Sequence, residues 1–237
     1  MTGFTKTKSF LGGASIGTLG GLIGLGGAEF RLPFLVGVLR IDTLHAIIIN
    51  LLISLVTVSF ALVFRGIDER VISEMPIVLN LLAGTLIGAW MGANYASRID
   101  KARLEKLIFV LLVFLSFVLL SHVFLDFDKG LHLGMWLQVT LGFVLGIGIG
   151  MISSLLGVAG GELLIPVIVL LYGVDIKLAG TLSLAISFPT LLIGIYKYHK
   201  NRRLHEVYGF KDILVFMALG SIIGAFLGSL LVGIVSS

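Results

Sequence analysis

Residues 24–33 read Gly-Leu-Gly-Gly-Ala-Glu-Phe-Arg-Leu-Pro, and residues 157–166 read Gly-Val-Ala-Gly-Gly-Glu-Leu-Leu-Ile-Pro. The two stretches match at an offset of 133 residues, and each places one glutamate directly after a run of small residues. The chain is therefore an internal duplication in which each copy carries a glycine-rich break within apolar sequence. In a membrane protein, paired breaks at corresponding positions of two halves are the best sequence indication of a transport site.

The composition of the chain is that of a membrane protein. Of its 237 residues, 57% are hydrophobic and 13% are charged, and the mean hydropathy is +1.12. Apolar runs close to or above the roughly 18–20 residues that cross a bilayer recur along the chain. The absence of cysteine excludes disulfides and thiolate metal sites. The net charge of +4 is concentrated in short loops, which indicates membrane topology, with a lipid bilayer as partner and no nucleic acid.

The apolar segments differ in length. They lie at residues 10–25, 30–39, 43–64, 76–97, 106–125, 133–156, 163–172, 178–196 and 212–235. The segments 30–39 and 163–172 are about half as long as a membrane crossing requires, and each directly follows one of the glycine–glutamate motifs. We therefore expect each motif to be the bend of a hairpin of two helices, at least one of them short, that enters the membrane and returns to its own side.

The distribution of Lys and Arg orients these segments. Positively charged loops face the cytoplasm, and placing the loop at residues 98–106 inside also places 12 Lys and Arg inside and 4 outside. The N-terminus is then cytoplasmic and the C-terminus is outside. The first hairpin enters from the cytoplasm and the second from outside, because segment 106–125 is an additional crossing between the two copies. We predict a multi-pass protein of the cell inner (plasma) membrane.

These observations predict an all-α polytopic membrane protein with two inverted repeats. Each repeat is expected to be a broken-helix hairpin followed by two transmembrane helices, with one linking transmembrane helix between the repeats. The expected boundaries are 1–100 for the first repeat, 101–130 for the linking helix and 131–237 for the second repeat. Two opposed hairpins that meet near the middle of the bilayer recur in secondary transporters.

The motif loops and the helices that follow them supply the candidate binding residues. Glycine permits backbone conformations that other residues avoid, and a broken helix offers free N–H donors and a partial positive charge to an anion. We therefore expect the substrate between the two hairpin tips. The candidate substrate-binding residues are Gly26, Gly27, Ala28, Arg31, Asn50, Ser54, Ala159, Gly160, Gly161, Ser183 and Ser187, and the candidate helix-break residues are Gly24, Pro33, Gly157 and Pro166.

The charged residues within the motifs are the candidates with the most specific chemical roles. A carboxylate in a membrane-spanning segment is costly unless it is paired, protonated or hydrated, and Glu29 and Glu162 occupy both duplicated positions. Two roles are open to them: a proton-coupling or gating group, or a brace that accepts backbone N–H bonds at the bend. Three roles are open to Arg31, whose equivalent is Leu164: an ion pair with Glu29, bidentate contact with an oxyanion, or extension to the cytoplasmic surface.

Enzyme motifs are absent from the sequence. It contains no His-Glu-x-x-His metalloprotease motif, no Gly-x-Ser-x-Gly nucleophile elbow and no Walker lysine. No cluster of His, Asp and Glu has the spacing of metal ligands. We therefore predict a protein that is not an enzyme, with no catalytic residues, no metal and no other cofactor.

The doubled motif resembles that of the TauE/SafE sulfite exporter family, also called the toluene sulfonate uptake permeases. The pattern Gly-x-Gly-Gly-(Gly or Ala)-x-x-x-x-Pro occurs twice, with Ala28 and Ala159 in place of glycines of the idealised pattern. The paired glutamates and Arg31 are not part of the general motif. The resemblance extends through both repeats, and it implies a polytopic inner-membrane protein that moves small sulfur-containing or carboxylated anions such as sulfite or sulfonates.

The sequence thus predicts a secondary transporter that carries a small anion by alternating access. Protons are a candidate coupling ion, and a homodimer is a candidate assembly. Within transport, the alternative is a passive anion channel. The alternative from another class is a non-transporting membrane subunit or an intramembrane enzyme. Solute flux in liposomes that contain only this protein distinguishes these, since a channel gives a large ohmic current and a subunit or enzyme gives neither flux nor current.

Overall fold

The computed structural model of the chain describes residues 3–23, 27–65, 69–110, 113 and 134–235. All regular secondary structure in these residues is helical, as the sequence predicts. Five helices in this part of the chain are long and apolar enough to cross a membrane, which is the make-up of a multi-pass membrane protein. They lie at Thr43–Val63, Met75–Ala96, Met135–Leu156, Ile176–Lys200 and Leu204–Gly228.

The helices follow one another with short connections. In chain order they are α1 (Gly3–Ile23), α2 (Ala28–Pro33), α3 (Thr43–Arg65), α4 (Glu69–Ser73), α5 (Met75–Ala96), α7 (Met135–Leu156), α8 (Gly161–Tyr172), α9 (Ile176–Lys200) and α10 (Lys211–Val235). A π-helical turn, η1 (Phe34–Val38), continues α2, and a 3-10 segment, η2 (Leu204–Phe210), precedes α10. Residues 101–110 are also helical.

The predicted apolar segments agree with these helices apart from a few residues at their ends. The five long segments between 43 and 97 and between 133 and 235 coincide with α3, α5, α7, α9 and α10. Of the two half-length segments, 163–172 lies in the 12-residue α8, and α2 and η1 together cover most of 30–39. Most of the predicted segment 106–125 lies outside the described residues, so the linking helix stays a prediction.

One boundary differs from the prediction: α1 begins at Gly3 rather than near residue 10. The first turns of α1 are polar, and apolar patterning therefore gives no sign of them. They are held by α10, since Lys6 Nζ lies 3.1 Å from Asp212 Oδ2.

The most extensive helix contacts join the first helix of one repeat to the last helix of the other. α1 packs along α10, and α7 packs along α5. Small residues let the backbones touch: a Cβ atom at Gly84 would overlap the carbonyl oxygen of Phe143 in α7, and one at Gly220 would overlap that of Phe10 in α1. Gly84 aligns with Gly220 at an offset of 136, and Phe10 with Phe143 at 133, so the same contact occurs twice.

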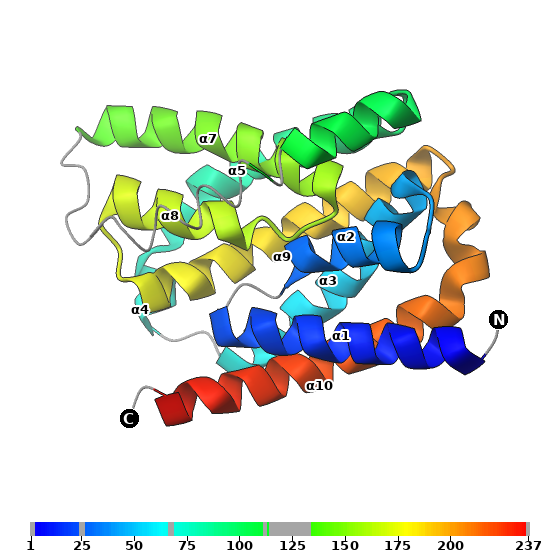
Figure 1. The fold of residues 1–237 in the computed structure, drawn as a ribbon. Helices are drawn as coiled ribbons and strands as arrows, with labels where there is room; N and C mark the ends of the chain where they lie inside the picture. Colours follow the sequence, from blue (N-terminus) through cyan, green and yellow to red (C-terminus); the bar gives the residue numbers. More distant parts are fainter. Residues whose placement is uncertain (1–2, 24–26, 66–68, 111–112, 114–133, 236–237) are drawn as a thin grey trace.

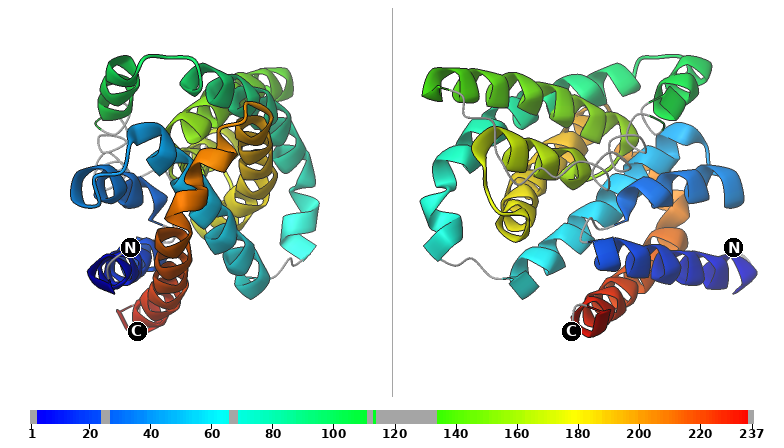
Figure 2. Two further views of the ribbon diagram at one scale, coloured as in Figure 1. Left: turned by 90° about the vertical axis from the view of Figure 1, so that its right-hand side faces the viewer. Right: turned by 60° about the vertical axis from the view of Figure 1, so that its left-hand side comes forward.

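The two helix pairs lie on opposite sides of the molecule, with α3, α8 and α9 between them (Figures 1 and 2). In Figure 1, α1 and α10 both run from right to left, whereas α7 runs from left to right. The first helices of the two repeats therefore run in opposite directions.

α3 and α9 form the centre of the molecule. Among the five long apolar helices they have the largest buried shares of their most apolar stretches, 50% for α3 and 56% for α9. Ile47, Ile48 and Ile49 of α3 are each 0% exposed although successive residues of a helix point in different directions. This part of α3 is therefore surrounded by protein, and the polar side chains buried on α3 and α9 are kept away from lipid.

Candidate functional site

Two glycines with positive φ build the helix break in the second repeat. Gly157 (φ 69°) directly follows α7, and Gly160 (φ 79°) directly precedes α8. Glycine adopts this left-handed conformation without a steric cost. Gly157 also lies against the carbonyl oxygen of Ile47 in α3, which a Cβ atom would overlap. The hydroxyl of Ser153 donates a hydrogen bond to the carbonyl oxygen of Val158 and so holds the chain as it leaves α7.

The first repeat has a corresponding break. Gly27 (φ 69°) directly precedes α2, as Gly160 precedes α8. Gly24 and Gly26 lie outside the described residues. The two prolines of the motifs follow the breaks, since each lies within the helix that comes next: they are Pro33, the last residue of α2, and Pro166 in α8.

The two breaks meet in the interior. In Figure 1 the N-terminal ends of α2 and α8 point toward the middle of the molecule from opposite sides. Their first turns bring Glu29, Arg31 and Glu162 close enough for the three charges to interact. The exposed fractions of these residues are 4%, 0% and 1%. We call Glu29, Arg31 and Glu162 the central charge site.

Arg31 is held from α3. Its Nη1 donates hydrogen bonds of 3.3 Å to Asn50 Oδ1 and of 3.3 Å to Ser54 Oγ. Asn50 in turn donates from Nδ2 to the carbonyl oxygen of Ala28, at 2.8 Å. Asn50 therefore connects the guanidinium group of Arg31 to the backbone at the start of α2. Of the three roles open to Arg31, extension to the cytoplasmic surface is wrong, because the side chain points into the protein.

The carboxylate groups of Glu29 and Glu162 lie buried side by side. The oxygens of both are shielded from solvent, and the Glu162 carboxyl group is within hydrogen-bonding reach of that of Glu29 and of its own backbone N–H. With both carboxylates ionised and Arg31 charged, the formal charge of the site is −1, and one added proton brings it to zero.

The half of the site that belongs to the second repeat is neutral apart from Glu162. Leu164 stands at the position equivalent to Arg31 and is 1% exposed. Ser183, which is equivalent to Asn50, donates its hydroxyl to the carbonyl oxygen of Gly180 in its own helix, at 2.8 Å. Its Oγ atom lies near the backbone of Gly161. Ser187, equivalent to Ser54, is 0% exposed, and its hydroxyl has no hydrogen-bond partner among the described residues.

Two further candidates are buried. Ala28 is the first residue of α2 and Ala159 lies between α7 and α8, with exposed fractions of 2% and 5%. The structure thus joins Ala28, Arg31, Asn50 and Ser54 through hydrogen bonds and places Ser183 near Gly161.

Sequence reasoning overlooked Thr85, which is 0% exposed. Its hydroxyl lies 2.8 Å from that of Thr190 and so connects α5 to α9. Thr85 lies among the closely packed glycines of α5, so the sequence pattern suggests only another small residue at a helix contact. The signal that could have found it is its equivalence with Ser221 at an offset of 136, because both positions carry a hydroxyl group within apolar sequence.

Comparison with known proteins gives one match. The family model described as Sulfite exporter TauE/SafE matches residues 9–237. This range includes both helix breaks and every residue of the central charge site. No curated protein and no solved structure matches the chain.

Proposed function

The chain belongs to the TauE/SafE sulfite exporter family, a family of membrane transporters, and on this basis we propose that it is a secondary transporter of a small anion. In this proposal the anion binds at the central charge site together with a proton, and the site opens to each side of the cytoplasmic membrane in turn. The proposed substrates are sulfite, sulfonates and related sulfur-containing or carboxylated anions.

The observation that carries the proposal is one buried arginine beside two carboxylates where the two helix breaks meet. A guanidinium group binds the oxygens of an oxyanion in bidentate fashion. The hydrogen bonds from Arg31 to Asn50 and Ser54 fix its position before an anion arrives. The Asn50 amide and the Ser54 hydroxyl add neutral polar groups on the same side of the anion.

The charge of the site supports coupling to protons. Two unit charges about 4 Å apart interact by roughly 4 kcal/mol at an effective dielectric constant of about 20. An anion that entered while Glu29 and Glu162 were both ionised would meet repulsion of this order. A proton on either carboxyl group removes one source of that repulsion, so anion and proton binding favour one another. Two buried carboxyl groups that share one cation support the proton-coupling role, whereas the backbone N–H beside the Glu162 carboxyl group supports the role of a brace.

The membrane potential decides how many protons each direction of transport needs. At 100 mV, negative inside, moving one negative charge into the cell costs about 2.3 kcal/mol, which corresponds to a roughly 50-fold gradient. Export of a monoanion without a proton would therefore run on the potential alone, whereas export together with one proton is electroneutral. Import becomes electroneutral with one proton and is driven by the potential with two, and the two glutamates are the proposed proton carriers for import.

The burial of the central charge site supports alternating access. Glu29, Arg31 and Glu162 are at most 4% exposed, so an ion reaches them only after helices on one side move apart. The opposite directions of α1 and α7 (Figure 1) support two repeats that are inverted in the membrane. In the proposed topology, the N-terminus is cytoplasmic and the C-terminus is outside.

Flux of radiolabelled sulfite into liposomes that contain only this protein tests the proposal. Wild-type flux should be saturable, and Arg31→Gln should lose about 100-fold because the anion then has no cation to bind. The matched control is Arg98→Gln, since Arg98 is exposed and follows α5, and its flux should equal that of the wild type. Unchanged flux in Arg31→Gln would refute the assigned site. A large ohmic current would indicate a passive channel, and no flux at all would indicate a non-transporting protein.

A further inference from the structure

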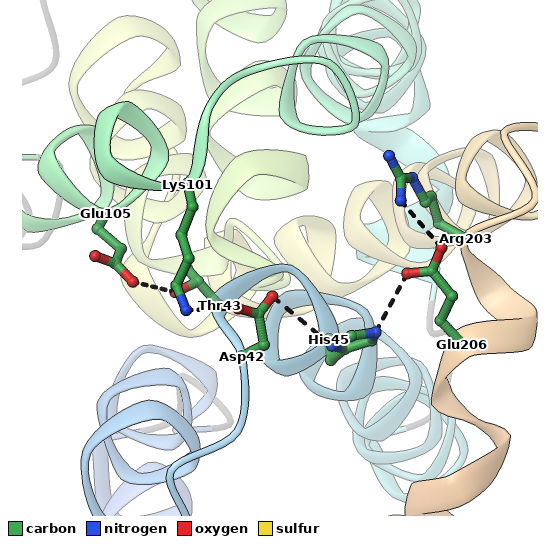
Figure 3. A network of polar contacts seen from close by, with 7 residues as sticks. All are labelled: Asp42, Thr43, His45, Lys101, Glu105, Arg203 and Glu206. Atoms are coloured by element: carbon green, nitrogen blue, oxygen red, sulfur yellow. Dashed lines mark hydrogen bonds and ion pairs between the residues drawn. The ribbon is translucent and has the colours of Figure 1, made fainter.

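Polar contacts tie separate segments of the chain together at one end of the molecule (Figure 3). Lys101 Nζ lies 2.7 Å from Asp42 Oδ1, and the Thr43 hydroxyl donates a hydrogen bond of 2.8 Å to Glu105 Oε1. Asp42 and Thr43 are at the start of α3, whereas Lys101 and Glu105 belong to the helical segment that follows α5. These contacts hold the start of α3 against that segment.

His45 extends the contacts to the connection between α9 and α10. Its Nδ1 atom lies 3.7 Å from Asp42 Oδ2, and its Nε2 atom lies 3.2 Å from Glu206 Oε2 in η2. Glu206 also accepts a hydrogen bond of 3.0 Å from Arg203, which donates another of 3.4 Å to the carbonyl oxygen of Ser97. We call the seven residues drawn in Figure 3 the end network: Asp42, Thr43, His45, Lys101, Glu105, Arg203 and Glu206.

The backbone beside the end network is strained at two positions. Arg40 (φ 54°) and Arg202 (φ 59°) are the non-glycine residues with positive φ in the described part of the chain. Such conformations persist where surrounding contacts hold them in place. Arg40 lies two residues before Asp42, and Arg202 directly precedes Arg203. Opening the network would therefore let both connections relax.

The opposite end of the molecule is held by different chemistry. Asp175 stands at the position equivalent to Asp42, but its carboxylate accepts hydrogen bonds from two backbone N–H groups in the first turn of its own helix, α9. Between helices at that end, the Asn80 amide donates a hydrogen bond of 2.7 Å to the Tyr172 hydroxyl. The described contacts between segments are thus ionic at one end and neutral at the other.

We propose that the end network is the cytoplasmic gate of the anion pathway, an inference that rests on the proposed function. α3 carries His45 at its start and, further along, Asn50 and Ser54, which hold Arg31. Breaking the network frees the start of α3 from η2 and from the segment after α5, and so exposes the central charge site to the cytoplasm. Solvent-exposed ion pairs are individually weak, which suits contacts that form and break in every transport cycle.

His45 makes this gate sensitive to cytoplasmic pH. An imidazolium carries a positive charge and attracts the carboxylates of Asp42 and Glu206 together. A neutral imidazole lacks this charge, so the attraction is lost, and Asp42 and Glu206 are then left with Lys101 and Arg203 as their ion partners. Protonation of His45 therefore stabilises the closed gate. We expect the gate to open more readily as cytoplasmic pH rises from about 6 to about 8.

Charged groups face His45 from the neighbouring elements. Lys101 faces Asp42 and holds the pKa of that carboxyl below its ordinary value through a hydrogen bond. Arg203 forms an ion pair with Glu206, with Nη1 3.0 Å from Oε1. The ring of Phe210 packs against His45 with the centroids 5.7 Å apart. Within the end network, the response to pH is assigned to the imidazole of His45.

Two other histidines lie near η2. His199 packs against His205 with ring centroids 6.0 Å apart, and His205 packs against Tyr208 at 5.3 Å. Their contribution to any pH dependence is separated from that of His45 by the variant His205→Gln.

A thiol reporter tests the gate without requiring transport. The native chain has no cysteine, and Ser187→Cys places a single thiol at a position that is 0% exposed. The measured quantity is its rate of labelling by a membrane-impermeant thiol reagent added on the cytoplasmic side. His45→Gln and Glu206→Gln should each raise this rate about threefold to fivefold. Arg103→Gln is the matched control with no change expected, because Arg103 pairs with Asp100 in the same segment.

The pH profile of labelling gives the second arm of the test. The labelling rate should rise with cytoplasmic pH when His45 is present, become independent of pH in His45→Gln, and keep the wild-type profile in His205→Gln. Unchanged labelling in both His45→Gln and Glu206→Gln would overturn the gate, whatever the sulfite flux. Faster labelling in a protein that moves no anion would support the opening of this end and refute anion transport.

Cross-linking covers the case in which the charge variants fold poorly. Thr43 and Glu105 are in contact, so the pair Thr43→Cys and Glu105→Cys can be joined by a short reagent that a reductant cleaves. The joined protein should show no flux of methanesulfonate, which unlike sulfite does not cleave disulfides, and the reductant should restore this flux. Flux that persists in fully joined protein would overturn the gate.

Discussion

The two repeats contribute equivalent positions to the central charge site but place different side chains in them. Both provide a buried glutamate after a glycine break, whereas the first repeat has Arg31 and Asn50 where the second has Leu164 and Ser183. The shared parts create two similar elements that meet in the interior. The parts that differ give the site one cationic pole, and that pole lies in the first repeat.

The two ends of the molecule also differ, and the charged contacts again belong to the first repeat. Arg31, the cationic pole, is hydrogen-bonded to α3, and the end network contacts the start of the same helix. At the opposite end, Asp175 serves only the first turn of α9 among the described contacts. In our account, the anion-binding pole and the charged gate therefore move with one helix, which couples anion binding to opening on the cytoplasmic side.

Removing the cationic pole should have the largest effect. Arg31→Leu makes the first repeat like the second at this position, and we expect sulfite flux to fall by about 100-fold or more because a buried charge partner is lost. The exchange variant Arg31→Leu with Leu164→Arg should not restore flux, since no asparagine stands opposite position 164. Flux in liposomes measures both variants. Recovery in the exchange variant would show that the two halves are interchangeable.

Removing the shared carboxylates should change coupling more than binding. Glu29→Gln together with Glu162→Gln keeps size and hydrogen bonding but removes the titrating groups. If one proton accompanies each anion, wild-type import should respond about tenfold to each unit of pH gradient, whereas the double variant should not respond. Import is measured at several imposed pH gradients. A double variant that responds like the wild type would leave these glutamates as structural braces.

Truncating the equivalent residues Asn50 on α3 and Ser183 on α9 should change the stability of the protein by different amounts. Asn50→Ala removes the connection between Arg31 and the Ala28 carbonyl, and we expect a loss of about 1–3 kcal/mol in unfolding free energy. Ser183→Ala removes a hydroxyl that bonds within its own helix, so its effect should stay below about 1 kcal/mol. Thermal unfolding in detergent compares the two. Equal losses would contradict the asymmetry.

The smallest effect is expected at the exposed end network. Lys101→Met removes the hydrogen bond that lowers the pKa of Asp42 below its ordinary value of 3.8. A carboxyl group with a lowered folded-state pKa stabilises the protein above its unfolded-state pKa, and this contribution is lost as pH falls through the folded-state value. The melting temperature of the variant should therefore be slightly reduced at neutral pH and equal to wild type at a pH below the folded-state pKa of Asp42.

A control at the opposite end completes this comparison. Lys177 is exposed near the start of α9, and Lys177→Met should leave the melting temperature unchanged at both pH values. A difference between Lys101→Met and wild type that is the same at neutral and acidic pH would show that Lys101 acts through contacts other than Asp42.

The order of the helices could be predicted from sequence, but their pairing could not. Segment length and the glycine motifs indicate where helices start and break, as at Gly157 and Gly160. The start of α1 was misjudged because its first turns are polar and are held by α10. Local patterning also cannot say which helix the glycines of α5 face, since a ridge of small residues packs equally well on any close neighbour.

The central charge site could be predicted in part. Duplication singles out Glu29 and Glu162, because a costly residue that occurs at both equivalent positions is unlikely by chance. That Arg31 turns inward toward α3 depends on the position of Asn50 in space, which the sequence does not give. The end network could not be predicted at all, because Asp42, Lys101 and Glu206 lie far apart in the chain and resemble ordinary charged loop residues.

The central claim is that an anion and a proton bind together at Glu29, Arg31 and Glu162. Calorimetric titration with methanesulfonate, which stays a monoanion at neutral pH, in buffers of different ionisation enthalpy counts the protons taken up on binding. We expect wild-type protein to take up about one proton per anion, because one proton neutralises the site that the anion enters. The double variant Glu29→Gln with Glu162→Gln should bind the anion without taking up a proton. Wild-type binding without proton uptake, or the same uptake in the double variant, would contradict the claim.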